Sequence, residues 1–456
     1  MEATVQTVSR RTIAAYAIGS VGTGGFATLP GLVLVYYLTD TLGIAALAAG
    51  LVVTLAKIWD VVIDPVIGTL SDHGLAATGS RRRLMVLGAT LLPVFFVLTF
   101  AAPAGLDGSV AAVWVTLAFL LCATAFSLFQ VPYIALPAEL ATGYDDRTRL
   151  LTWRVVVLAL AILLFGAGGP LLRSLSDDQR LGYLIMAAVA GLIIGAGMFV
   201  SASVAPRNVP SVKARPTASL MQSYSSGVNA LRRSQPFRAL LATFVLQGLA
   251  TGVMLAGAQY VATWVLHSEA AVSLLFIALI APALLLAPPW GRLSRRIGKE
   301  RAFALASLLF GVAALTLVGQ LWAPGSWIYA PVALAGAAYA GMQSLPMAML
   351  PDVISHDAKA HGDGRAGIFG GVWTAGETAG MALGATGLTI VLSITGYVAS
   401  AGNTTTEQSS TAVAGIVLSF SVVPAAIMLL SLLTLARYRL RRHDINVRET
   451  VEEATR

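Results

Sequence analysis

Long apolar stretches alternate with short polar connections along the whole chain. Each stretch has about 20 residues or more, which is the length that a helix needs to cross a hydrocarbon core of about 30 Å. Charged residues make up only 11% of the chain, against about 25% in soluble domains, and the mean hydropathy is +0.78. The pattern predicts an all-α integral membrane protein with twelve transmembrane helices, at residues 12–38, 42–70, 84–104, 109–137, 151–173, 181–204, 236–264, 269–290, 301–321, 327–351, 366–395 and 412–436.

Basic residues gather on one side of the predicted membrane. All but three of the 30 Lys and Arg residues fall in the termini or in the connections that share their side. The exceptions are Lys57, which lies inside a span, and Arg173 and Arg180, which lie on the opposite side. The positive-inside rule therefore predicts that both termini are cytoplasmic. The rule also accounts for the net charge of +8, so we do not expect nucleic-acid binding, the usual alternative for a basic chain.

A polar connection divides the spans into two sets of six. Residues 205–235 carry several prolines and serines and separate an N-terminal half, 1–204, from a C-terminal half, 236–436, with a cytoplasmic tail at 437–456. An internal repeat supports this division, because G-x-L-S and a basic cluster follow both the second span (GTLSDHGLAATGSRRR) and the eighth span (GRLSRRIGKER). Parallel repeats of this kind are typical of secondary transporters.

The repeated loop resembles the signature of the major facilitator superfamily, in which G-x-L-x-D precedes basic residues. Gly68, Leu70, Asp72 and residues 81–83 occupy the matching positions. The resemblance implies the major facilitator fold, with two pseudo-symmetric six-helix halves. It also implies that this loop latches the cytoplasmic ends of helices, with Asp72 paired to a cytoplasmic arginine.

Three further segments are similar to the glycoside-pentoside-hexuronide cation symporters, the melibiose permease-like subfamily. They are the W-D-x-x-x-D-P-x-x-G pattern at 59–68 and the connections at 131–154 and 350–373. The resemblance covers nearly the whole chain and implies a multi-pass transporter of a bacterial cytoplasmic (inner) membrane, functional as a monomer. The cytoplasmic-loop arginines that we assign to gating, together with Asp72, are Arg147, Arg149, Arg154, Arg295 and Arg365.

Lys57, Asp60 and Asp64 lie inside the second span, at spacings that place them on one face of a helix. Charges at this depth are costly unless they face protein, water or an ion. One explanation is a structural ion pair between Lys57 and one aspartate, but that pair leaves the second carboxylate without a counter-charge. A bound cation or a proton supplies it. The resemblance implies that Asp60 and Asp64 bind the coupling ion, with the hydroxyl of Ser127 nearby.

The coupling ion is either H⁺ or Na⁺, and the residues favour H⁺. Sodium-using members of the family place an asparagine directly before the second aspartate, where this chain has Ile63. Sodium at Asp60 and Asp64 therefore lacks one neutral oxygen ligand. A proton fits a buried carboxylate pair, because desolvation and like charge both disfavour two negative charges there.

The predicted substrate contacts are Lys57, Gln130, Tyr133, Trp373 and Glu377. In the resembling family, the position of Glu377 carries a lysine, so this chain reverses the charge. Glu377 either compensates Lys57, or meets a positively charged or hydroxyl-rich solute, or carries a second proton. The sugar-binding aspartates of that family correspond to Gly24 and Gln130, and a tryptophan corresponds to Ile134, so the solute is not inherited with the family.

Three functions remain after these observations. The first is H⁺- or Na⁺-coupled symport of a sugar, glycoside or sugar-acid-like solute. The second is proton-coupled export of an organic cation or amphiphile, which Glu377 motivates. The third is a sensor or assembly factor built as a helical bundle. No G-x-S-x-G or G-x-x-x-x-G-K-[ST] motif occurs, and the five histidines have no metal-ligand spacing, so we expect neither an enzyme nor a cofactor.

Overall fold

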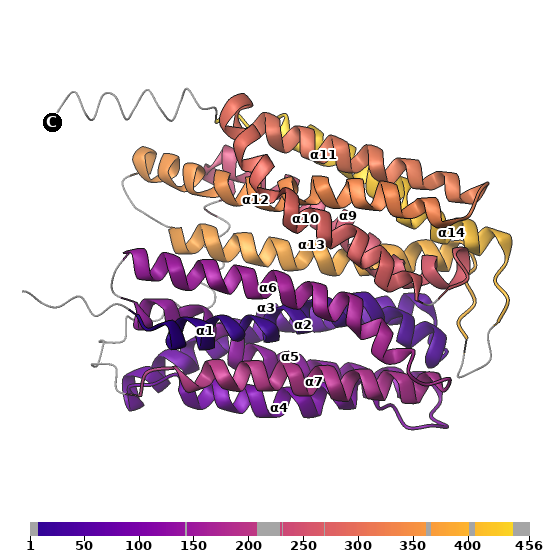
Figure 1. Cartoon of the computed structure of the whole chain (residues 1–456), viewed down its shortest axis with the longest axis horizontal. Helices are drawn as coiled ribbons and strands as arrows, with labels where there is room; N and C mark the ends of the chain where they lie inside the picture. The colour runs from indigo at the N-terminus through magenta and orange to yellow at the C-terminus, as the bar shows by residue number, and fades with distance from the viewer. Residues whose placement is uncertain are drawn as a thin grey trace, which may run out of the picture. The chain divides into compact units, whose positions relative to one another are not determined.

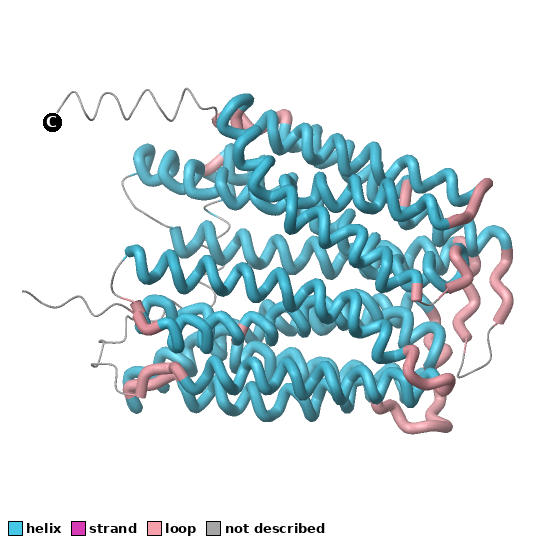
Figure 2. Tube along the Cα trace, viewed as in Figure 1, coloured by secondary structure: helices cyan, strands magenta, loops and turns pink. Residues whose placement is uncertain are grey.

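The computed structural model of the chain describes residues 8–141, 144–207, 229, 231–268, 270–361, 366–400 and 406–440. All elements of regular secondary structure in these ranges are helices (Figure 1 and Figure 2). The chain folds into two compact units, which comprise residues 1–217 with 398–407 and residues 218–397 with 408–456. Most of the predicted linker, at 208–228 and 230, lies outside the described residues, as does the tail from 441 onward.

The described residues of the first unit form seven α-helices and one short π-helix, η1. Their bounds are α1 Arg10–Ile18, α2 Ser20–Tyr36, η1 Tyr37–Thr41, α3 Ala46–Thr78, α4 Arg82–Phe100, α5 Gly108–Leu140, α6 Tyr144–Arg173 and α7 Gln179–Ser203. The main pairings are α2 with α6, α3 with α5, and α4 with both α5 and α7. In Figure 1, α4 and α7 lie side by side along most of their length.

The second unit repeats these pairings with its own helices. Its elements are α9 Gln235–Tyr260, η2 Val261–Val265, α10 Ala271–Ile297, α11 Lys299–Thr316, η3 Leu317–Leu321, η4 Ser326–Ile328, α12 Tyr329–His361, α13 Ala366–Ile394, α14 Ser410–Phe420 and α15 Val422–Leu435. Here α9 pairs with α13, α10 with α12, and α11 with α12 and α15. Each unit therefore packs its helices in the same chain order.

The first long helix ends in the same way in both units. Both η1 and η2 are π-helices of five residues. The amide of Leu42 donates to the carbonyl of Tyr37 over 3.1 Å, and the amide of Leu266 donates to Val261 over 3.0 Å. Because π-turns are rare, their recurrence at matching places supports the internal repeat that the loop motif predicts.

Eleven helical segments of the described chain are long and apolar enough to cross a membrane. They correspond to every predicted span except 327–351. That stretch forms most of α12, but its many alanines and glycines, together with Gln343 and Ser344, make it less apolar than the others. The protein is thus an all-helical membrane protein, while the count of twelve spans and the cytoplasmic position of both termini stay predictions.

Glycines bring α9 and α13 into backbone contact. Gly248 and Gly252 on α9 face glycines on α13. A Cβ atom added to Gly252 would lie 2.6 Å from the carbonyl oxygen of Met381, and one added to Gly384 would lie 2.6 Å from that of Leu249. Small residues at four-residue spacing are how membrane helices approach closely without a hydrophobic driving force.

Alanine at Gly384 is expected to weaken the second unit. Its Cβ overlaps a backbone oxygen that cannot move alone, so the free energy of unfolding falls by about 2–3 kcal/mol. Thermal unfolding of the purified protein in detergent measures the loss. The matched control is Gly387→Ala on the same helix, whose Cβ meets its nearest side chain at an ordinary 3.5 Å. Equal melting temperatures for the two variants would contradict the close contact.

Candidate functional site

The charged residues of the second span lie on α3, where that helix packs against α5. The Nζ atom of Lys57 lies 3.0 Å from Oδ2 of Asp60, so these residues form an ion pair one turn apart. The Asp60 side chain is only 14% exposed. The pair neutralises one carboxylate, as the structural explanation of these charges requires, and it leaves Asp64 with its own negative charge.

Two carboxylate oxygens on α3 are buried and have no hydrogen-bond partner among the described residues. They are Oδ1 of Asp60 and Oδ1 of Asp64. The buried hydroxyl of Ser127 on α5 lies close enough to Asp64 to stabilise its charged carboxylate. Unpaired oxygens of this kind are costly in a membrane interior unless a cation or proton meets them. With one lysine and two aspartates, the cluster carries a net charge of −1, which a single proton or monovalent cation neutralises.

Other neutral oxygens near the aspartates already have partners. The indole Nε1 of Trp59 donates to Oγ1 of Thr124 over 2.8 Å, and this hydroxyl itself donates to the carbonyl of Leu120 over 2.8 Å. Among the described residues, no group of three or more His, Cys, Asp or Glu side chains could hold a metal ion. Among the described residues, the acceptors identified at the cluster are the carboxylate oxygens of Asp60 and Asp64 and the hydroxyl of Ser127.

Gln130 lies on α5, where its side chain meets α2. Its Oε1 accepts a hydrogen bond from Oγ1 of Thr23 over 2.7 Å. The neighbouring Gly24 faces α6. A Cβ atom at Gly24 would lie 2.8 Å from Cβ of Ala161 and 3.1 Å from the amide nitrogen of Ile162. The position that carries an aspartate in the resembling family is thus filled by helix packing in this chain.

Tyr133 lies in the packed interior of the first unit. Its side chain is fully buried, its ring stacks on Phe129, and its hydroxyl lies 2.9 Å from the hydroxyl of Ser20 and 3.0 Å from the carbonyl of Tyr16. The guanidinium of Arg154 lies 5.3 Å from the centre of the ring. These contacts satisfy the hydroxyl and place Arg154 beside an aromatic ring, so we leave Tyr133 out of the proposed substrate contacts.

Arg81 joins the loop after α3 to the end of α5. It contacts Asp72 at 2.7 Å, Glu139 at 2.6 Å and the hydroxyl of Ser71 at 2.6 Å. Burial alone lowers the pKa of Arg81, but the hydrogen bonds to Glu139 and Asp72 outweigh burial and raise its pKa, so the guanidinium stays charged. Asp72 is therefore paired with an arginine of its own loop, and Glu139 is a partner that the sequence did not reveal.

The second unit has a matching ion pair between α11 and α12. We call the two ion pairs, Arg81–Glu139 and Lys299–Asp352, the latches. The Nζ atom of Lys299 lies 2.5 Å from Oδ2 of Asp352. Lys299 opens α11 as Arg81 precedes α4, and Asp352 directly follows Pro351, much as Glu139 follows Pro137 on α5. An acidic residue one or two positions after a proline is therefore the sequence pattern that could have identified Glu139 as the partner of Arg81.

The other predicted gating arginines have different surroundings. Arg149 lies 3.8 Å from Asp146 and is half exposed, and Arg295 is exposed. The side chain of Arg147 and the whole of Arg365 lie outside the described residues. None of these observations tests the gating roles, which stay predictions.

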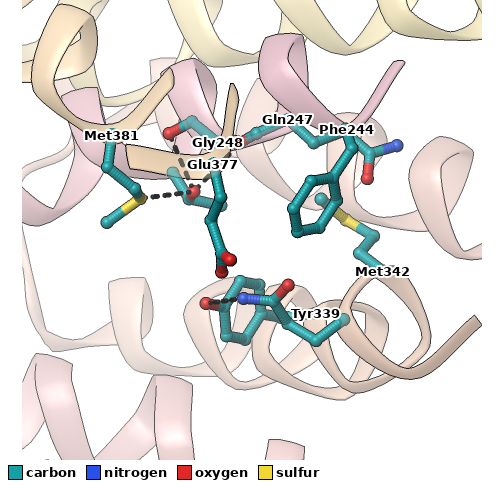
Figure 3. A pocket seen from close by; sticks show the side chains of 9 residues that line it. Phe244, Gln247, Gly248, Tyr339, Met342, Glu377 and Met381 are labelled. Carbon is teal, nitrogen blue, oxygen red and sulfur yellow. Dashed lines mark hydrogen bonds between the residues drawn. The ribbon is translucent and has the colours of Figure 1, made fainter. Parts of the chain in front are cut away.

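Glu377 lies in a pocket of the second unit, between α9, α12 and α13. Figure 3 shows its carboxylate pointing from α13 toward Tyr339 on α12. Among the described residues, no ion pair or hydrogen bond to this carboxylate is found. The pocket is a small cavity of about 20 Å³, and it is lined by Phe244, Gln247, Gly248, Thr251, Tyr339, Met342, Gln343, Glu377 and Met381.

Two buried polar atoms beside this pocket have no partner. Trp373 is 3% exposed and stacks on Phe244 with the ring centres 4.3 Å apart, and its Nε1 is unpaired. The amide nitrogen of Gln247 donates to the hydroxyl of Ser307 over 2.7 Å, while its Oε1 is unpaired. Sequence reasoning missed Gln247, although a glutamine in an otherwise apolar span is a visible signal.

Lys57 and Glu377 belong to different units. Within its own unit, Lys57 pairs with Asp60. The alternative that Glu377 compensates Lys57 stays a prediction.

Comparison with known proteins gives consistent matches along the chain. A model of the family described as MFS/sugar transport protein matches residues 15–442. A glucuronide carrier protein homolog of Escherichia coli (strain K12) is 24% identical over 98% of this chain and 96% of its own length. A putative glycoside/cation symporter of the same strain is 27% identical over 39% of each chain. The structure of the xylose transporter XylE from E. coli matches 95% of this chain and 98% of its own, with a TM-score of 0.64 and 13% identity, which shows the shared fold.

Proposed function

Because the chain belongs to the MFS/sugar transport protein family, we propose that it moves a sugar or glycoside across the membrane together with a cation. Membership of this family makes it a membrane transporter and not an enzyme. The proposed mechanism is symport by alternating access, in a bacterial cytoplasmic membrane, with the protein active as a monomer. The solute is a sugar, a glycoside or a related sugar acid.

One observation carries the proposal of ion coupling. Asp60 and Asp64 each bury a carboxylate oxygen without a partner, and their cluster with Lys57 keeps a net charge of −1. Binding of a cation neutralises the cluster and removes the cost of moving an unpaired charge through a closed state. If ion and solute both favour the same closed state, each raises the affinity for the other.

We propose H⁺ as the coupling ion and Na⁺ as the second candidate. A proton needs one carboxylate oxygen, and two are available. Sodium needs several oxygens around it, and the described neighbourhood offers Ser127 as the one neutral hydroxyl bonded to the pair, while Ile63 supplies no oxygen.

Export of an organic cation by antiport has less support. Its motivation is Glu377, whereas the two E. coli relatives named above are described as a glucuronide carrier homolog and a putative glycoside/cation symporter. The carboxylate of Glu377 is equally compatible with symport.

Uptake by proteoliposomes separates these possibilities. A panel of radiolabelled hexosides is offered to vesicles with an imposed inward H⁺ gradient, an inward Na⁺ gradient, or neither. We expect accumulation above the external concentration with the H⁺ gradient, and its collapse with a protonophore. Accumulation driven only by Na⁺ would reassign the ion, loss of preloaded solute would indicate antiport, and gradient-independent uptake would contradict coupling.

A further inference from the structure

The pocket around Glu377 carries a negative charge that no lining residue balances. Its lining includes a single ionisable acid, Glu377, and no Lys, Arg or His. The phenol of Tyr339 lies close enough to interact electrostatically with the carboxylate. A half-buried carboxylate in a membrane protein is costly without a counter-charge. Within the second unit, this carboxylate is neutralised either by a proton or by a positive group of a bound ligand.

The pocket offers several acceptors to a ligand, and the buried indole nitrogen of Trp373 beside it is a donor. Both oxygens of Glu377 and Oε1 of Gln247 lack hydrogen-bond donors among the described residues. The amide nitrogen of Gln343 donates to the hydroxyl of Tyr339 over 2.5 Å, and the hydroxyl of Thr251 donates to the carbonyls of α9. An ammonium group brings three donors and no acceptor, so it complements this set.

The apolar part of the lining suits a cation as well. Phe244 contributes an aromatic ring to the pocket lining, and stacking on Trp373 holds this ring in place. Met342 and Met381 add polarisable thioethers on either side in Figure 3. Aromatic faces attract desolvated cations, and together with a carboxylate they form a common recognition site for amines.

From these contacts we infer that the transported solute carries a protonated amine, as an amino sugar or a basic glycoside does, and that the Glu377 pocket binds this amine. The inference rests on the proposed sugar and glycoside transport and narrows it. A solute with a carboxylate is disfavoured, because it would meet a second carboxylate in the pocket.

Equilibrium binding to the purified full-length protein, without any ion gradient, tests the inference. Methyl glycosides of glucose, galactose and mannose are compared in three forms: neutral, 2-amino-2-deoxy, and uronate. We expect the amino form of the preferred ring to bind at least about tenfold more tightly than the neutral form, the size of a charge-assisted hydrogen bond. Equal affinity, preference for the uronate, or binding of no member overturns the inference.

Glu377→Gln keeps the shape of the side chain and removes its charge. We expect this variant to lose the preference for the amino form while its affinity for the neutral form changes little. Glu407→Gln, the same change at an exposed residue of the first unit, is the control and keeps the preference. A Glu377→Gln protein that still prefers the amine contradicts the assignment to this pocket.

The transport assay tests symport and the binding assay tests the amine inference, so either hypothesis can be rejected while the other stands. If no gradient drives accumulation but the amine preference holds, symport is wrong and the pocket assignment stands. If a neutral glycoside or a uronide accumulates with the gradient and the amine has no advantage, symport stands and the amine inference is wrong.

Discussion

Asparagine in place of Asp64 will abolish ion-driven accumulation and leave a protein that at most equilibrates its solute. The substitution keeps the size of the side chain and its contact with Ser127 on α5. It removes the charge whose unpaired oxygen defines the cation site. With that charge absent, Lys57 and Asp60 neutralise each other, so the first unit passes between its states without an ion.

Two assays on the same proteoliposomes check this result. Uptake against a gradient will be lost in Asp64→Asn, while exchange of labelled for unlabelled solute at equal concentrations persists. Asp60→Asn will lose accumulation too, and will also melt at a lower temperature, because it leaves Lys57 without its partner. Retention of concentrative uptake by both variants would show that the coupling site lies elsewhere.

Methionine in place of Arg81 will be the most destabilising of the latch substitutions. Arg81 and Glu139 are about nine-tenths buried, and their contact is 2.6 Å. Removing one partner of a buried ion pair leaves the other charge buried without a counter-charge. This lowers the free energy of unfolding by about 3–5 kcal/mol. The contact with Asp72 adds little to this figure, because the Asp72 side chain is half exposed.

The second unit provides the matched control for Arg81. Lys299→Met breaks the equivalent pair with Asp352, but both of those side chains are more exposed, so its melting temperature will fall less. Glu139→Gln in the Arg81→Met background should recover part of the loss, because it removes the unmet charge. A double variant as unstable as Arg81→Met alone would mean that the Arg81 side chain acts through packing instead.

The helices of this chain were predictable because lipid imposes a simple rule on sequence. A segment of about 20 apolar residues has few alternatives to a spanning helix. α12 shows the limit of that rule, since its small and polar residues lower its hydropathy while its packing against α10 and α11 still makes it a helix. Periodicity also predicted correctly that Lys57 and Asp60 share a face, because i and i+3 are neighbours on any α-helix.

The partners of buried polar groups were harder to predict. Arg81 and Glu139 are 58 residues apart, and several loop arginines matched the same motif, so sequence spacing could not select among them. Gln247, Tyr339 and Gln343 looked like ordinary polar residues of apolar spans. They became a candidate site only when three helices brought them beside Glu377.

Contact between α2 and α6 has a consequence for how solute preference can change. An aspartate introduced at Gly24 would meet Ala161, and also the backbone nitrogen of Ile162 and the backbone oxygen of Leu158. No single exchange of a side chain on α6 clears atoms that belong to the main chain. An acidic contact at position 24 therefore requires α2 and α6 to move apart, so a change of side chain alone does not introduce it.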